Sequence, residues 1–422
     1  MGLPDSETES GCDLLFISHL TAANQWTQDA SDPYFGSLPW QLQEQGYRIR
    51  IALIDHTATS LSDLKGMAQT PATVVRTLIP RRLERKKEAV IAGKLAAVAA
   101  RLRDGSDEVN LRRLAARQAK QGASRQSLRI GTTISQLVGR HRPKALVFTY
   151  EGHAWERIAM HLSRQIDPDI RCIAVHHAIL APMQHAMTTS YGGTFDPDVI
   201  LAAGRAALAW LSHAPGLKGI PVDLLGSPRA RSATPVPDQP KDGKKCLFLP
   251  EGMVSESIFL AHAAYDLAAQ RPDLTCTIRL HPLTSRDDLA SREPRFRTAP
   301  SNIEWSPPNR TLDEDGHLAT WAVYRGSSAV LSAMTSGAIP VYLGNEPLEL
   351  QINPLRGAEE IVQVINHSAK LATSLDARAI DVGMLRKGWD YAQSYYTQMD
   401  SNVILRHAFG SVICPSMIGD AT

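Results

Sequence analysis

Residues 324–343 read YRGSSAVLSAMTSGAIPVYL. An apolar strand pattern leads into a small hydroxyl-rich turn at Gly326-Ser327-Ser328, a short helix follows, and Gly337 ends that helix before a second apolar strand. A strand, a helix and a second strand in this order form the unit of a parallel α/β fold. The turn offers backbone N–H groups, two hydroxyls and the positive end of a helix dipole, which together suit a phosphate. An ordinary helix cap is the alternative.

Apolar runs with the pattern of strands alternate with amphipathic stretches along the whole chain, and this alternation predicts parallel α/β architecture. The expected strands are 14–18, 48–54, 145–149, 172–175 and 199–203 in a first half, and 246–249, 275–280, 303–305, 321–324 and 339–343 in a second. We therefore expect two Rossmann-like, doubly wound domains facing a cleft, with ligands beyond the carboxyl ends of the strands. Their expected bounds are 1–228 and 246–380, with a polar, proline-rich linker at 229–245 and C-terminal helices over 381–422 that are candidates for crossing back to the first domain.

Length and composition limit what the chain can be. Its 422 residues, 43% of them hydrophobic, suffice for two domains with separate cores. No apolar run approaches the roughly 18 to 20 residues that cross a membrane, and the first residues are acidic and polar, so we expect a cytoplasmic protein. The five cysteines lack Cys-x-x-Cys spacing, which argues against a disulfide framework and a zinc site.

One segment departs from the low formal charge of the chain, which is +2. Residues 76–129 hold fifteen Lys or Arg against five acids, a charge of +10, so the remainder carries about −8. Alanine-rich stretches at 91–102 and 111–121 predict helices, and we interpret the segment as a basic helical insertion in the first domain. It is either a solvated hairpin or a surface for peripheral contact with an anionic membrane or an anionic saccharide acceptor. Nucleic acid is disfavoured because no aromatic side chains interleave the charges.

Two short motifs follow strands at the place where parallel sheets bind ligands. His281 leaves a strand of the second half with its exit fixed by Pro282, and an imidazole there can stabilise or protonate a departing phosphate. Glu151 and Gly152 follow a buried strand of the first half, where a carboxylate suits a general base for an acceptor hydroxyl. A histidine in an ordinary turn and a capping or ion-paired carboxylate are the structural alternatives.

Further polar residues are expected to border the same cleft. His177 follows another strand of the first half, and His19 and Tyr34 belong to the first strand and the loop after it, so all three are candidates for contacts with an acceptor. Neighbouring histidines invite a metal site, but no acidic partner stands at ligand spacing, and we expect no metal. In the second half, Glu251 and Gly252 follow the strand at 246–249, where glycine allows a nucleotide to approach closely.

The order of these motifs resembles that of GT-B glycosyltransferases that use CMP-activated acidic sugars. These are the bacterial sialyltransferases and polysialyltransferases and the related Kdo and nonulosonate transferases of surface-polysaccharide assembly, in which an acidic-Gly motif precedes a His-Pro motif and a Ser-Ser or Ser-Thr motif. The corresponding residues here are Glu151-Gly152, His281-Pro282 and Ser327-Ser328. The stretch YEGHAWE at 150–156 also resembles a signature of surface-carbohydrate biosynthesis proteins. The segment 76–129 has no counterpart in this resemblance.

What the resemblance implies is an inverting, metal-independent transfer from a CMP donor to a hydroxyl of a glycan, glycolipid or glycoprotein. Glu151 would take the proton of the hydroxyl, while His281 and the two serines hold the departing phosphate. Arg325 either adds charge to the phosphate site or pairs with a carboxylate. The first motif has one acid where polysialyltransferases often have two, which weakens the assignment of the base. The remaining residues that we place in the donor site are Gly326, Pro282, Glu251 and Gly252.

Other classes remain open. Retaining GT-B enzymes usually carry one glutamate before the Ala-Met of this helix and another eight positions earlier, where this chain has Ser332 and Tyr324. This departure argues against the retaining class without excluding inverting enzymes that use UDP-sugars. The UDP-sugar 2-epimerases share the fold and a similar Ser-Gly turn, but they too would need acidic residues after it. A non-catalytic GT-B protein that binds nucleotide or glycan is the alternative from outside the enzymes.

Overall fold

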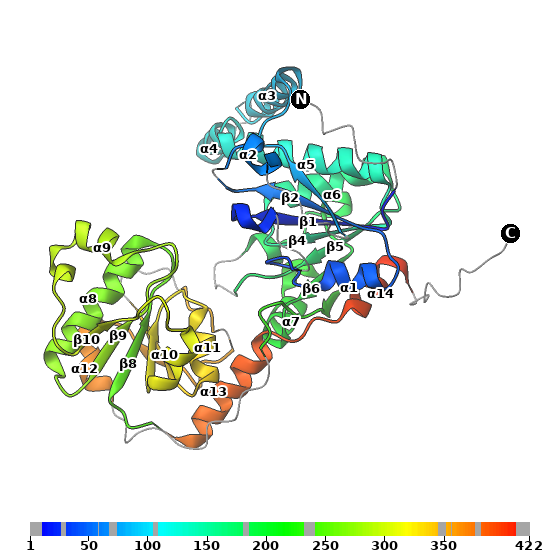
Figure 1. Cartoon of the computed structure of the whole chain (residues 1–422). Coiled ribbons are helices and arrows are strands. Elements are labelled where there is room, and N and C mark those ends of the chain that lie inside the picture. The colour runs from blue at the N-terminus through cyan, green and yellow to red at the C-terminus, as the bar shows by residue number, and fades with distance from the viewer. Residues whose placement is uncertain are drawn as a thin grey trace. The chain divides into compact units, whose positions relative to one another are not determined.

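The computed structural model describes residues 11–26, 31–57, 59–66, 74–103, 109–179, 185–231, 241–344, 352–355, 357–375 and 381–410. The chain divides into two compact units, each of which is described by itself (Figure 1). Unit 1 comprises 1–177, 185–229 and 398–422, and unit 2 comprises 178–184 and 230–397. Each unit contains one parallel sheet with helices around it, as the alternation of apolar runs predicts.

Unit 1 contains a seven-stranded sheet in the order β3-β2-β1-β4-β5-β6-β7. The strands are β1 Leu14–Leu20, β2 Ile49–Asp55, β3 Val75–Ile79, β4 Ala145–Thr149, β5 Arg171–Val175, β6 Val199–Ala202 and β7 Val222–Leu224. The α-helices of its described part are α1 Leu38–Glu44, α2 Leu61–Gly66, α3 Arg85–Arg101, α4 Val109–Ala119, α5 Gly122–His141, α6 Ala154–Ile166, α7 Arg205–Ser212 and α14 Ser401–Phe409. Every residue of β4 is buried, which fits a sheet covered on both faces.

The core of unit 1 joins residues from both ends of the chain. On one face of the sheet, Phe16 of β1 packs edge-on against Phe35 with ring centroids 5.1 Å apart. The same cluster includes Trp40 of α1 and Ile404 of α14, so the last described helix completes the core of the first unit. Figure 1 shows α5 and α6 on the opposite face.

Unit 2 contains a six-stranded sheet in the order β10-β9-β8-β11-β12-β13. Its strands are β8 Lys245–Leu249, β9 Thr275–Ile278, β10 Ile303–Trp305, β11 Trp321–Tyr324, β12 Ile339–Leu343 and β13 Gln363–Ile365. Its described α-helices are α8 Val254–Gln270, α9 Arg286–Arg292, α10 Leu312–Leu318, α11 Ala329–Thr335, α12 Leu371–Ser374 and α13 Val382–Tyr395. The core joins apolar residues of α8 to those of the central strands, among them Phe248 and Trp321.

The two sheets share one topological feature that positions ligands. In each, the chain moves outward from its first strand and then returns to pair its fourth strand with the other side of the first, β4 with β1 and β11 with β8. Doubly wound folds bind ligands beyond the carboxyl ends of the strands at such a switch point. The loops after β1 and β4, and those after β8 and β11, are therefore the places for function in each unit.

The basic segment differs from the prediction at both of its ends. Residues 75–79 form β3, which pairs with β2, and residues from 122 onward begin α5, so the addition to the sheet consists of α3 and α4. Arg76 lies within β3, where its guanidinium stands 5.4 Å from the ring centroid of Trp40 and bonds the carbonyl oxygen of Gln25 at 3.3 Å. Because the charged Arg76 interrupts the apolar pattern of this short strand, the sequence did not predict β3. The short strands β7 and β13 were also not predicted, and residues 232–240 of the expected linker lie outside the described residues.

Candidate functional site

The loop after β4 places the carboxylate of Glu151 between two imidazoles. Nε2 of His153 lies 3.1 Å from Oε2, and Nε2 of His177 lies 3.1 Å from Oε1. Because a carboxylate only accepts hydrogen bonds, both rings donate through Nε2. The hydrogen bonds from His153 and His177 hold the pKa of Glu151 well below its usual range, and the bond with Glu151 raises the pKa of His153. The Glu151 side chain is 34% exposed, so a ligand can reach it.

Gly152 permits this arrangement through its backbone. Its φ is +81°, in the left-handed region that favours glycine. A Cβ here would lie 2.3 Å from the carbonyl carbon of Ala186 and 2.4 Å from the backbone nitrogen of Met187. The loop at 185–189 therefore passes directly against the residue that joins Glu151 to His153.

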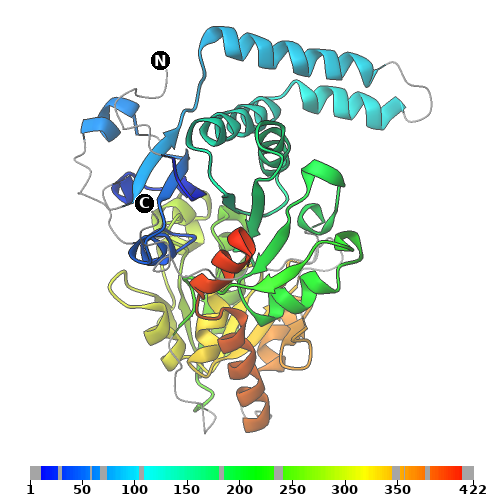
Figure 2. The same ribbon diagram turned by 90° about the vertical axis from the view of Figure 1, so that its right-hand side faces the viewer.

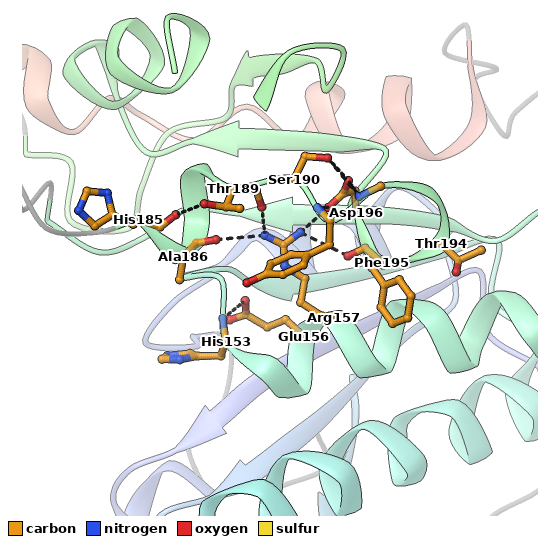
Figure 3. Close-up of polar contacts among 12 residues, drawn as sticks. His153, Glu156, Arg157, His185, Ala186, Thr189, Ser190, Thr194, Phe195 and Asp196 are labelled. Atoms are coloured by element: carbon orange, nitrogen blue, oxygen red, sulfur yellow. Dashed lines mark hydrogen bonds and ion pairs between the residues drawn. The ribbon is translucent and has the colours of Figure 1, made fainter. Parts of the chain in front are cut away.

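Arg157 of α6 holds that loop in place (Figure 3). Its guanidinium donates to Asp196 Oδ1 at 2.6 Å, to the carbonyl oxygen of Thr189 at 2.7 Å and to that of Ala186 at 3.1 Å. Beside it, the buried Glu156 accepts the backbone N–H of His153 at 2.8 Å, and burial raises the pKa of Glu156 to about 8. These contacts fix the path of the chain on both sides of Gly152.

A second histidine pair lies at the switch point between β1 and β4. Nε2 of His19 is 2.8 Å from the hydroxyl of Thr149, and Nδ1 is 2.9 Å from Nε2 of His56. Burial lowers the pKa of His19 to about 3, so its ring is neutral at cellular pH. The ring links the ends of three neighbouring strands, β2, β1 and β4.

Tyr34 completes the group on unit 1. Its ring centroid lies 5.0 Å from that of His19 and 4.8 Å from that of His177. The buried Asp32 fixes its loop, because Oδ1 accepts the hydroxyl of Ser18 at 2.9 Å and the backbone N–H of Tyr34 at 2.8 Å. The structure thus brings together Glu151, His177, His19 and Tyr34, all of which the sequence assigned to one site.

Sequence reasoning did not assign His153, His56, Thr149 or Arg157 to the site. A histidine two positions after the carboxylate, across a glycine, was the signal for His153. The neighbouring histidines lie differently: His176 is buried, and His185 is exposed on the loop over Gly152. In the ranges that the structure describes, no group of three or more His, Cys, Asp or Glu can hold a metal ion.

The predicted residues of unit 2 follow the adjacent strands β9, β8 and β11. Nδ1 of His281 accepts the backbone N–H of Leu283 at 3.2 Å, which leaves the proton of the neutral ring on Nε2. A Cβ on Gly252 would lie 3.1 Å from that Nδ1, so the glycine allows the ring to stand against the loop after β8. Pro282 is exposed beside it.

Glu251 and Gly326 form the other contact at this switch point. A Cβ on Gly326 would lie 2.3 Å from Oε2 of Glu251, so a larger residue would require the end of the Glu251 side chain to move. Oε1 of Glu251 is buried and has no hydrogen-bond partner among the described residues. Burial raises the pKa of Glu251.

The residues of the turn after β11 have two different roles. The two serines lead into α11, and Arg325 pairs with a carboxylate. The hydroxyl of Ser327 accepts the backbone N–H of Ala329 at 3.4 Å, and Ser328 precedes α11. Arg325 is buried, and its Nε lies 2.5 Å from Oε2 of Glu256. This guanidinium therefore has the carboxylate partner that the sequence left as one of two alternatives.

Arg279 has a similar partner, because NH1 lies 2.8 Å from Oδ2 of Asp315. Both arginines that stand nearest the ends of β9 and β11 are thus held by acids of their own unit. Hydrogen bonding to an anion at this place would come from His281, serine hydroxyls and backbone N–H groups.

Comparison with known proteins shows the fold of the chain. No protein-family model and no curated protein matches it. The glycotransferase of kitacinnamycin superposes with a TM-score of 0.54 at 12% identity, over 94% of this chain and 99% of that chain. A Listeria monocytogenes protein assigned as a UDP-N-acetylglucosamine 2-epimerase superposes with a TM-score of 0.51 at 12% identity, over 95% and 98%. The two sheets have the GT-B fold that these proteins share, as the sequence predicts.

Proposed function

We propose that the chain is an inverting, metal-independent glycosyltransferase that moves an acidic sugar from a CMP donor to a hydroxyl of a surface glycan or glycoconjugate. The observation that carries the proposal is the Glu151 carboxylate held between two imidazoles at the carboxyl end of the unit 1 sheet. Activation of a hydroxyl requires a positioned proton acceptor, and this group provides one.

Glu151 and His153 act together as that acceptor. A carboxylate with a strongly lowered pKa is a weak base by itself, whereas the His153 ring has a raised pKa and a side chain that is 57% exposed. Glu151 orients the ring and stabilises the imidazolium that forms. The acceptor O–H bond breaks and its proton passes to Nδ1 of the ring, whose Nε2–H stays bonded to Glu151, while the oxygen forms a bond to the anomeric carbon. The bond from that carbon to the phosphate oxygen breaks, and its electron pair leaves with CMP.

Unit 2 supplies the donor side of the proposal. Nε2–H of His281 has no hydrogen-bond partner among the described residues and can donate to the leaving phosphate, and Gly252 and Gly326 reduce the bulk of the loops at the switch point. Because Arg279 and Arg325 are already paired with acids, anion recognition rests on neutral donors. A donor with one phosphate suits such a site better than a diphosphate, and this supports CMP.

A UDP-sugar enzyme is the second candidate, favoured by the fold shared with a protein assigned as a UDP-N-acetylglucosamine 2-epimerase. Nucleotide binding to the full chain separates the two. Because a ligand of the folded state stabilises it by RT ln(1 + [L]/Kd), a thermal-shift series reports affinity directly. We expect CMP to raise the melting temperature at concentrations where UMP and UDP have no effect. A preference for UDP overturns the CMP assignment.

Turnover separates an enzyme from a binding protein. Release of CMP from CMP-linked acidic sugars is measured for the wild type and for Glu151→Gln, with His213→Gln as the control, since His213 is an exposed histidine that bonds its own helix. We expect Glu151→Gln to lose about 10²–10⁴-fold in rate with CMP binding unchanged. His213→Gln should behave as the wild type. CMP binding without turnover in the wild type would identify a non-catalytic protein.

The same assay tests the donor side. We expect His281→Gln to slow CMP release on the order of 10²–10³-fold, because it removes one donor to developing negative charge. His317→Gln is the matched control in unit 2, since His317 is exposed and its Nδ1 lies 2.7 Å from the carbonyl oxygen of Asp313. Equal rates for the two variants would exclude a role for His281 in departure of the phosphate.

A further inference from the structure

The helix pair α3 and α4 exposes an unusual share of the apolar surface. The described residues include eleven large hydrophobic side chains that are exposed, and five of them belong to these two helices, which hold 17 and 11 residues. The five are Val90, Val98, Val109, Leu111 and Leu114. Val90 is 58% exposed and Leu111 is 61% exposed. We name the exposed residues of α3 and α4 the hairpin surface.

The hairpin surface is also strongly basic. The sequence of α3 contains five Lys or Arg and one acid, and that of α4 contains three Arg and no acid. The single acid, Glu88, forms an ion pair with Arg129 of α5, whose Nε lies 2.5 Å from Oε1 of Glu88. The basic side chains therefore keep their charge available to a partner.

On α3 the basic and apolar residues share one face. Lys87, Val90, Lys94, Val98 and Arg101 are spaced by three or four positions, and all are exposed. Ile91 and Ala99 of the same helix are buried, so one side of α3 packs within unit 1, whereas the five residues named above have no such cover. Figure 2 shows α3 and α4 beside each other, extending beyond α5.

We propose that the hairpin surface docks on a bilayer with anionic headgroups. Lysine and arginine stems lie along apolar surface with their charges in the headgroup layer, while the valines and leucines enter the acyl boundary. The apolar side chains gain from burial in the acyl boundary, which contact with water alone does not provide. A surface made for nucleic acid would carry stacking aromatic side chains, and neither helix has a Phe, Tyr or Trp.

This proposal stands apart from the proposed function, because lipid binding is measured without a sugar donor. No helix among the described residues has the length and apolar character to cross a membrane.

Each basic residue near an anionic bilayer contributes about fivefold in partitioning, so removal of three should reduce binding on the order of 10²-fold.

The test is flotation of the full chain with vesicles. One set contains phosphatidylcholine alone, and the other contains about a third phosphatidylglycerol, with each set run at low and high salt. We expect flotation only with the anionic vesicles and a loss at high salt. Absence of flotation at low salt, or retention of duplex DNA by the chain without vesicle binding, overturns the proposal.

Matched variants locate the contact. The charge variant changes Lys86, Lys87 and Lys94 to Gln, and its control changes the exposed Lys218, Lys244 and Lys370 to Gln with the same change in net charge. We expect the first to lose binding on the order of 10²-fold and the control to keep it. Equal loss in both would mean attraction by net charge alone and would overturn a site on the hairpin.

The apolar contribution has its own pair. Val90→Gln removes an apolar side chain from the hairpin surface, and Val364→Gln removes one from β13 that is 56% exposed. We expect vesicle binding to fall for Val90→Gln and to stay unchanged for Val364→Gln, with far-UV circular dichroism the same for both. Equal binding of the two variants would overturn insertion of the hairpin into the bilayer.

Discussion

Replacing Gly152 with alanine is expected to displace the loop at 185–189. The left-handed backbone conformation alone costs an alanine about 1 kcal/mol. The added Cβ would lie 2.3 Å from the carbonyl carbon of Ala186, whereas carbon atoms in contact stand about 3.5–4.0 Å apart, so the backbone must move by about 1 Å or more. That movement breaks the bond from Arg157 to the Ala186 carbonyl, a hydrogen bond from a charged group worth about 1.5–3 kcal/mol. We expect a total loss of about 2.5–4 kcal/mol in the free energy of unfolding.

Two measurements and one control test this number. Urea unfolding followed by tryptophan fluorescence gives the change in stability, and amide hydrogen exchange reports the loop at 185–196 directly. Gly219→Ala is the control, because Gly219 has a φ of +92° but no atom within 4 Å of its added Cβ. This variant should lose only about 1 kcal/mol and leave exchange of the loop unchanged.

A Gly152→Ala variant no less stable than Gly219→Ala, with normal exchange at 185–196, would contradict this expectation. The loop would then have moved without cost, and the Arg157 bonds would not hold it. The same variant should slow CMP release, because Gly152 joins Glu151 to His153 and its displacement separates the two groups. Full turnover would show that their spacing is not required.

Three further changes have defined outcomes. Since the folded pKa of His153 is raised, its stabilising contribution is complete below about pH 6.5 and is lost as pH rises through the folded value. Glu151→Gln should lower that titration midpoint in NMR spectra of ring-labelled histidine, and an unchanged midpoint would contradict the pair. Arg325→Met should lower the free energy of unfolding in urea by about 3–5 kcal/mol, because it leaves Glu256 without its partner. Adding Glu256→Gln should restore part of that stability, and no recovery would rule out the pairing. Gly326→Ala should lower the free energy of unfolding by about 1 kcal/mol or less, because the flexible end of the Glu251 side chain can move. It should also weaken CMP binding, and unchanged binding would place the nucleotide elsewhere.

The strands were predictable from the sequence because a strand buried on both faces is a continuous apolar run. The central strands β4, β11 and β12 are fully buried and match their predicted residues. The edge strand β3 has no such run. Its Arg76 is buried against Trp40, more than thirty positions away, and no local pattern reveals that packing.

The same distinction applies to the site. The sequence identified residues that follow strands, because the carboxyl ends of parallel strands converge at one edge of the sheet. It did not separate the two readings of Arg325, since the deciding partner, Glu256, lies 69 positions earlier on α8. His153 was not assigned because its role depends on a positive φ at Gly152, which brings the ring back to the carboxylate. Side-chain partners set by tertiary packing are the part that the sequence left open.

The candidate groups of unit 1 and those of unit 2 can be tested independently. In unit 1 the imidazoles of His153, His177 and His19 have hydrogen-bond partners in their own unit, so titration of His153 tests this half without any nucleotide. In unit 2 the loops are shaped by Gly252 and Gly326, and the nearby arginines are neutralised, so CMP binding tests this half without turnover. Turnover requires both. A chain that binds CMP but shows no shift of the His153 titration in Glu151→Gln would keep the donor assignment and lose the base, whereas the reverse result would keep the base and reopen the choice of donor.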